Sequence, residues 1–165
     1  MTYAIVYSSK TGNTEMLART VQQELPEKDC IYFGAPDPSA LKAERIYLGF
    51  WTDRGTCDED SLKFLKSLTT QELFLFGTAG FGGGKEYFNT ILENITSRLN
   101  KNLTLTGSFI CQGKMPPAVR QRYEKMMADP AQKNRMQTMI DNFDRALTHP
   151  DADDLRALRS ALHSL

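Results

Sequence analysis

The amino-acid sequence predicts a doubly wound α/β fold around a five-stranded parallel sheet. Its short apolar runs are continuous rather than alternating, which is typical of strands buried on both faces. Segments with apolar residues at helical spacing lie between these runs, as crossover helices require. The chain has 165 residues, of which 41% are hydrophobic, and this suits one domain with a packed core.

Five short runs rich in β-branched and aromatic residues are expected to form the strands. They comprise residues 2–8, 30–33, 45–50, 72–77 and 103–111. None of them contains a proline, so all are compatible with a place inside a sheet.

Helical patterns follow the strands along the chain. Phe88, Ile91 and Ile95 recur at intervals of three and four residues, which places them on one face of a helix. Asp129-Pro130 separates the last two patterns, because proline breaks a helix. Helices are expected around residues 18–25, 62–68, 88–99, 119–127 and 136–147.

A final segment, residues 150–165, starts with aspartates that suit a helix N-terminus. Leu155, Leu158 and Leu162 follow at helical spacing. We expect an appended helix, so that residues 1–147 form the domain and residues 148–165 form an extension packed on it.

Composition excludes several function classes. Twenty basic and twenty acidic residues give a net charge of zero, which does not favour nucleic-acid binding. The apolar runs are too short to cross a membrane and no signal-peptide layout is present, so a cytoplasmic location is expected. Three cysteines and two histidines have no spacing typical of a zinc site or a His-based triad, so no metal site is expected.

The loop after the first strand is rich in donors. In doubly wound sheets, ligands bind beyond the carboxyl ends of the strands. Ser9, Thr11, Asn13 and Thr14 stand there around Gly12, directly before a helix whose N-terminus favours anions. The loop is interpreted as a phosphate cradle, with a plain helix cap as the alternative. Neither the Walker A spacing nor the G-x-G-x-x-G fingerprint is present.

Two further loops leave the same edge of the predicted sheet. Residues 50–58 hold Trp51, the only tryptophan, which is expected to stack on a planar ligand, with core filling as the alternative. Residues 77–85 are rich in glycine, which lets a backbone approach a ligand closely, and Phe81 lies among the glycines. The three loops together suit a ligand with one phosphate and one large planar ring.

The stretch Ser9-x-Thr11-Gly12-Asn13-Thr14 resembles the phosphate loop of flavodoxins, which are FMN-binding electron carriers. The resemblance covers about residues 2–147 and implies strand order 2-1-3-4-5. The variant loops at residues 50–53 and 76–80 resemble a flavodoxin-like subgroup of anaerobic bacteria associated with bilirubin reduction. The resemblance assigns FMN binding to Ser9, Lys10, Thr11, Gly12, Asn13, Thr14, Trp51, Thr52, Asp53, Gly55, Thr56, Thr78, Ala79, Gly80, Phe81, Gly82 and Gly83.

Electron transfer to partner redox proteins, without a catalytic side chain, is the function that this resemblance implies. It places main-chain groups of Gly55 and Thr56 near the flavin N5. An FMN-dependent NAD(P)H reductase is an alternative, with Tyr87, Asp53 or Lys114 as the proton donor. A non-catalytic module that docks through the C-terminal helix is another alternative, and a homodimer is left open.

Overall fold

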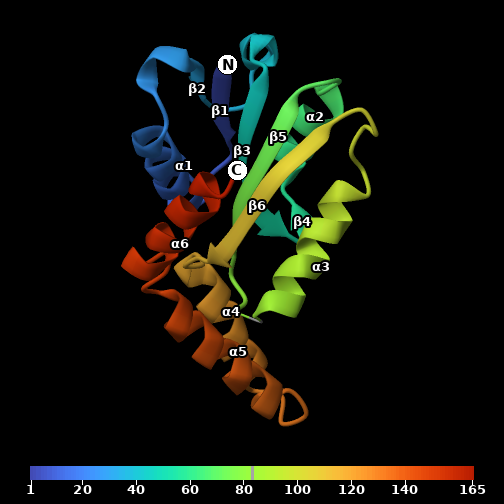
Figure 1. The fold of residues 1–165 in the computed structure, drawn as a ribbon. Coiled ribbons are helices and arrows are strands. Elements are labelled where there is room, and N and C mark those ends of the chain that lie inside the picture. Colours follow the sequence, from blue (N-terminus) through green and yellow to red (C-terminus); the bar gives the residue numbers. More distant parts are fainter. Residues whose placement is uncertain (83) are drawn as a thin grey trace.

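The computed structural model describes residues 1–82 and 84–165 and confirms the doubly wound α/β fold (Figure 1). The parallel strands have the order β2-β1-β3-β5-β6, which is the predicted order 2-1-3-4-5 once the short β4 is set aside. The strands are β1 (Tyr3–Tyr7), β2 (Cys30–Gly34), β3 (Arg45–Asp53), β4 (Thr56–Cys57), β5 (Glu72–Ala79) and β6 (Thr104–Gln112). The helices are α1 (Asn13–Glu24), α2 (Glu59–Ser67), α3 (Lys85–Thr96), α4 (Pro117–Met126), α5 (Lys133–Ala146) and α6 (Ala152–His163), with 3-10 turns at Glu27–Asp29 and Pro38–Lys42.

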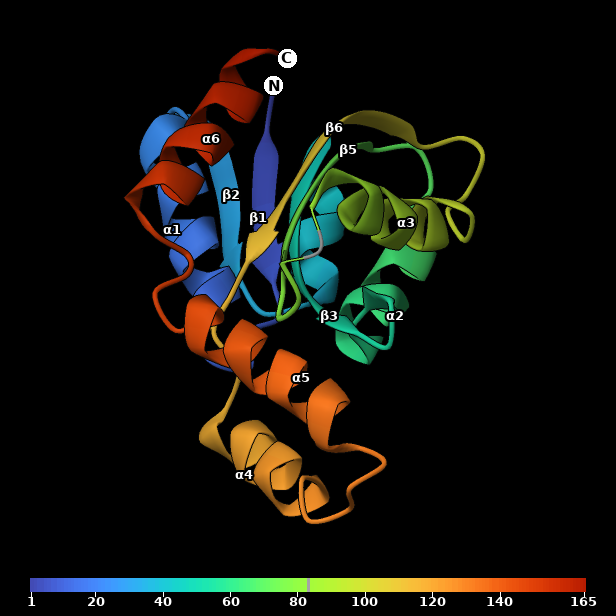
Figure 2. The same cartoon turned by 90° about the horizontal axis from the view of Figure 1, so that it is seen from below.

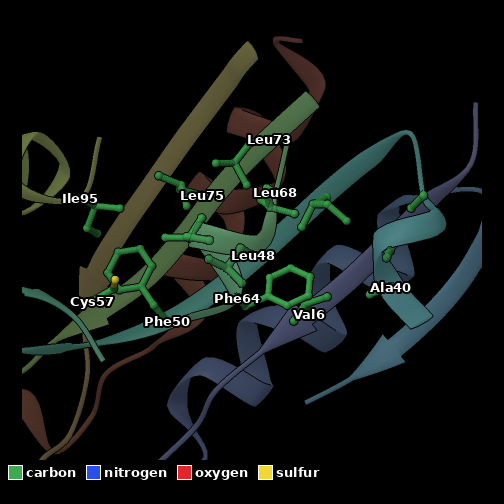
Figure 3. Close-up of a cluster of buried hydrophobic side chains, with 14 of the residues drawn as sticks. Val6, Ala40, Leu48, Phe50, Cys57, Phe64, Leu68, Leu73, Leu75 and Ile95 are labelled. Carbon is green, nitrogen blue, oxygen red and sulfur yellow. The ribbon is translucent and has the colours of Figure 1, made fainter. Parts of the chain in front are cut away.

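Helices cover both faces of the sheet, which explains why its central strands are apolar throughout (Figure 2). On one face, Leu48 and Phe50 of β3 pack with Phe64 of α2 and Ile95 of α3 (Figure 3). On the other face, Leu17 of α1 packs in the second core cluster. Within the described residues, no helix combines the length and apolarity that crossing a bilayer requires.

The C-terminal helix α6 lies on the sheet beside α1 and contributes to the core. Leu158 and Leu162 are 0% and 5% exposed in the cluster shared with α1, and Leu155 packs against that cluster. A capping box between Asp151 and Asp154 starts the helix. The alternative of docking a partner through these leucines is therefore wrong, because the domain's own core covers them.

The helices α4 and α5 form a hairpin beyond the carboxyl edge of the sheet (Figures 1 and 2). They pack on each other through a small apolar cluster of Tyr123, Met136 and Ile140. At the base of the hairpin, the backbone N–H of Lys114 donates to the carbonyl of His149 at 3.0 Å. The chain therefore leaves β6 and returns to α6 at nearly the same point.

Candidate functional site

The loop between β1 and α1 is folded around the hydroxyl of Ser9. Ser9 Oγ accepts from the backbone N–H groups of Gly12 at 3.1 Å and of Glu15 at 3.4 Å. Gly12 has φ 88°, in the left-handed region that favours glycine, and it is the residue that turns the chain into α1. The loop is thus pre-shaped by its own side chain and by one glycine.

Donors at the start of α1 remain available to an anion. The amides of Thr11, Asn13 and Thr14 donate to no acceptor among the described residues. The helix N-terminus adds a partial positive charge at the same place. The Thr14 hydroxyl, in contrast, donates to the carbonyl of Phe50 at 3.1 Å, so this side chain ties the loop to β3.

A β-hairpin stands where the sequence predicted only a loop. β3 continues through Trp51 to Asp53 and pairs with β4, in antiparallel register, across the turn formed by Arg54 and Gly55. Both turn residues have positive φ, 51° and 80°, as a two-residue hairpin turn of type I′ requires. The expectation that the strand ends at residue 50 was therefore wrong, because the hairpin extends it.

The carboxylate of Asp58 closes this hairpin. It accepts from the Trp51 N–H at 3.2 Å, from the Ser61 N–H at 3.1 Å and from the Ser61 hydroxyl at 2.8 Å, while only 2% of Asp58 is exposed. The same side chain therefore caps α2 and fixes the backbone of Trp51.

Asp58→Ala is expected to lower the free energy of unfolding by about 2 kcal/mol, because a helix cap is lost and buried donors are left without an acceptor. Urea denaturation followed by circular dichroism measures the change. Asp60→Ala, an exposed position in the same helix, is the control and should cost far less. Equal losses in the two variants would contradict a special role for Asp58.

Two buried hydroxyls on this hairpin have no partner. Thr52 Oγ1 and Thr56 Oγ1 make no hydrogen bond to any described residue, and the same holds for Asn13 Oδ1. Buried polar atoms are normally paired, since leaving one unpaired costs about 1–3 kcal/mol. Unpaired polar atoms on two loops of one sheet edge indicate a polar ligand.

A cavity of about 280 Å³ joins these loops at the carboxyl edge. It is smaller than the cavity of about 460 Å³ between residues 35–41 and α2, but it is the one lined by the donor-rich loop. Predicted residues that line it are Lys10, Thr11, Asn13, Trp51, Thr52, Asp53, Thr78, Gly80 and Phe81.

Two described residues of the predicted set that do not line the cavity make main-chain hydrogen bonds to other elements. Ala79 accepts from the Gly113 N–H at 2.9 Å, and the Gly55 carbonyl accepts from Asn94 Nδ2 of α3 at 2.8 Å. The main-chain contact of Gly55 and Thr56 with a flavin stays a prediction. Described residues of the predicted set that do not line the cavity are Ser9, Gly12, Thr14, Gly55, Thr56, Ala79 and Gly82, while Gly83 lies outside the described residues.

One wall of the cavity, apart from Lys114, was not predicted from the sequence. This wall follows β6 and includes Val119, Arg122 and Tyr123 of α4. The available signal was topological, because a segment that follows the last parallel strand must leave the same edge as the other loops. Further lining residues from this segment are Gly113, Lys114, Met115 and Pro116.

The charges around the cavity are mainly positive. Lys10, Lys114 and Arg122 line it with one acidic side chain, Asp53. Lys10 Nζ lies 5.0 Å from the centroid of the Trp51 ring, a cation–π distance. This balance suits a ligand that carries negative charge.

The thiol closest in sequence to the hairpin turn is not a redox group. Burial, and then the neighbouring Asp58, raise the pKa of Cys57 to about 11. The thiol is therefore protonated near neutral pH and unreactive. Burial also raises the pKa of Tyr87, whose ring meets Phe81 edge-on at 6.4 Å.

The residues present fit a flavin mononucleotide. The amides at the start of α1 suit a phosphate, Trp51 offers a flat surface, and the Thr52 hydroxyl, which has no partner among the described residues, suits a polar atom of a flavin ring. The cavity joins all three features at one edge.

Comparison with known proteins agrees with the fold. Residues 4–163 match the flavodoxin domain family, so the match includes α6 and extends beyond residue 147, where the expected resemblance ended. The chain is 40% identical to the flavodoxin-like domain-containing protein BilS of Clostridium symbiosum (strain WAL-14163), with 99% of this chain and 95% of the relative covered. It is 31% identical to BilS of Clostridioides difficile (strain CD3), with 92% and 88% covered.

Solved structures share the architecture at lower identity. The flavodoxin of Streptococcus pneumoniae TIGR4 has a TM-score of 0.58 at 14% identity, covering 99% of this chain and 96% of that one. Oxidised flavodoxin 2 from Bacillus cereus has a TM-score of 0.57 at 16% identity, covering 97% and 94%. With its strand order, its sequence match and these relatives, the chain belongs to the flavodoxin family.

Proposed function

We propose that this protein binds FMN non-covalently in the cavity at the carboxyl edge and transfers electrons between FMN and partner redox proteins. The convergence of a donor-rich loop, Trp51 and the unpaired buried polar atoms of Asn13 and Thr52 around that cavity carries the proposal. FMN, when bound, supplies one- and two-electron chemistry that protein side chains lack.

The chain's own residues bind and orient the cofactor. The amides of Thr11, Asn13 and Thr14 would hold the phosphate at the N-terminus of α1. Trp51 would offer its ring to the flavin, and the Thr52 hydroxyl would bind a polar atom of it. No side chain has to move a proton for electron transfer.

Redox partners that carry acidic surfaces suit this site better than basic ones. Lys10, Lys114 and Arg122 line the cavity, and opposite charges steer association.

Free thiols at Cys30, Cys57 and Cys111 support a cytoplasmic location, where thiols stay reduced.

An FMN-dependent reductase that acts on a small molecule is the second candidate. The observation that favours it is the additional wall from α4, because Val119 and Tyr123 enclose the cavity on a further side. Asp53 and Lys114, two of the predicted proton donors, line the cavity, whereas Tyr87 is not among the lining residues described. Rapid oxidation of added NADH by the FMN-loaded protein would favour this candidate over the carrier.

Titration of the apo protein with FMN tests the proposal. Trp51 is the only tryptophan, so its fluorescence should fall to a plateau at one FMN per chain. Trp51→Leu is expected to weaken FMN binding about tenfold, measured by flavin absorbance, because a stacked ring is lost. Trp51→Phe keeps a ring and should retain most of the affinity. Absence of FMN binding by the unmodified protein at high micromolar concentration would refute the proposed function.

A further inference from the structure

One side chain of α5 holds the residues on both sides of Phe81. Asn142 Oδ1 accepts from the Gly82 N–H at 3.2 Å, and Asn142 Nδ2 donates to the Gly80 carbonyl at 3.0 Å. Gln112 Nε2 donates to the same Gly80 carbonyl and to Asn142 Oδ1, each at 3.1 Å. An amide side chain can do this because it carries both a donor and an acceptor.

These bonds lie in a shielded environment. Asn142 is only 8% exposed, and all four bonds are at least partly buried. Shielding from water makes such a network costly to disrupt, since a polar group that loses its partner is not rescued by solvent. The loop between β5 and α3 is therefore held by a helix that lies 60 residues further along the chain.

A side chain at either clamped position would displace the end of a neighbouring side chain. A Cβ on Gly82 would lie 2.7 Å from Gln112 Oε1, and a Cβ on Gly80 would lie 2.5 Å from Met115 Sδ. The glycines that the sequence analysis assigned to close approach of a ligand thus also permit close approach of Gln112 and Met115.

Phe81 is the residue between the two clamped glycines, and it lines the cavity together with Trp51. The Gly80 carbonyl has two donors and the Gly82 amide has an acceptor, so the main chain around Phe81 is fixed from both sides. The ring of Tyr87 limits the Phe81 ring from the α3 side. The backbone clamp therefore determines where the Phe81 ring stands relative to the cavity.

We infer that Asn142 is a positioning residue for the flavin site. Asn142 holds Phe81 against the cavity, and it thereby makes the α4–α5 hairpin part of that site. The inference rests on the proposed function for the identity of the ligand. The clamp itself does not, because its bonds join protein groups alone and can be measured without FMN.

A double-mutant cycle tests whether Asn142 acts through Phe81. Asn142→Leu keeps the side-chain size and removes the hydrogen bonds to Gly80, Gly82 and Gln112, and it is expected to weaken FMN binding about tenfold. In a Phe81→Leu background the same change should weaken binding less than twofold, because the ring that Asn142 positions is gone. Asn134→Leu, an exposed position on the same helix, is the control and should leave binding unchanged.

Hydrogen exchange of the Gly82 amide in the apo protein gives a readout that needs no FMN. Asn142→Leu should speed this exchange at least tenfold, whereas Asn142→Asp, which keeps the acceptor, should preserve the protection. If the leucine variant does not fold, Asn142→Ala removes the same acceptor and should also speed the exchange of the Gly82 amide at least tenfold.

The outcomes separate the two proposals. Unchanged Gly82 exchange in Asn142→Leu would overturn the clamp, whatever binds in the cavity. Equal losses of FMN affinity in the two backgrounds would overturn action through Phe81 and assign Asn142 a general structural role. Failure of the unmodified protein to bind FMN would refute the proposed function, while the exchange measurement still decides the clamp.

Discussion

Phe50→Ala is expected to lower the free energy of unfolding by about 3–5 kcal/mol, since a fully buried ring is lost from the core. Phe50 lies between Leu48 and Cys57 in the cluster that α2 and α3 cover (Figure 3). Its ring fills the space beside Gly77, where a Cβ would come within 2.4 Å of the ring carbons. Urea denaturation with an unchanged m-value measures the loss.

Two companion variants make this prediction specific. Phe88→Ala, at a half-buried ring on α3, should cost clearly less. Gly77→Ala should cost about 1–3 kcal/mol in the unmodified chain, because the new methyl group collides with Phe50. In the Phe50→Ala background the same methyl group should cost almost nothing. Additive losses in the double variant would contradict the packing described.

Thr11→Asp is expected to weaken FMN binding about a hundredfold. Thr11 lines the cavity at the N-terminus of α1, and an aspartate there would repel the phosphate. Two unit charges about 5 Å apart at an effective dielectric constant of 20 repel by about 3 kcal/mol, which corresponds to this factor. Titration with FMN and with riboflavin measures the effect, because riboflavin lacks the phosphate and should bind the variant as it binds the unmodified protein.

The same substitution should act in the opposite direction on the apo protein. A carboxylate near the first turn of α1 interacts favourably with the helix dipole, so apo stability should be unchanged or rise by up to about 1 kcal/mol. Thr11→Ser keeps the hydroxyl and is the control for FMN binding. Equal weakening of FMN and riboflavin binding would show that Thr11 does not lie near the phosphate.

The sequence was sufficient to predict the sheet, because continuous apolar strands and the helices between them admit few arrangements. The sequence was insufficient to predict the hairpin at residues 51–57. This hairpin depends on a positive φ at Arg54, and an arginine does not indicate a positive φ. The sequence also predicted α6 as an appended helix packed on the domain, but it left docking of a partner open as an alternative. Leu158 and Leu162 form the same pattern whether they cover a core or dock a partner, and only tertiary packing distinguishes the two.

Local motifs predicted most of the candidate site. The donor-rich loop and Trp51 are each recognisable within a few residues of sequence, and the structure brings them to one cavity. The wall from α4 and the Asn142 clamp were missed because they involve partners far apart in the chain. Asn142 has no sequence signal near Gly80 or Gly82, so its role is visible only in three dimensions.

The hydrogen bond between Lys114 and His149 at the base of the α4–α5 hairpin has a consequence for protein engineering. It brings the two ends of the hairpin together, so the segment between them can change in length without displacing β6 or α6. The Lys114 carbonyl also accepts from Asn13 Nδ2 at 2.9 Å, which anchors this base to the first loop. Because Asn142 of the hairpin also holds the loop between β5 and α3, an exchanged hairpin would keep that loop in place only if it carried an asparagine at the same position.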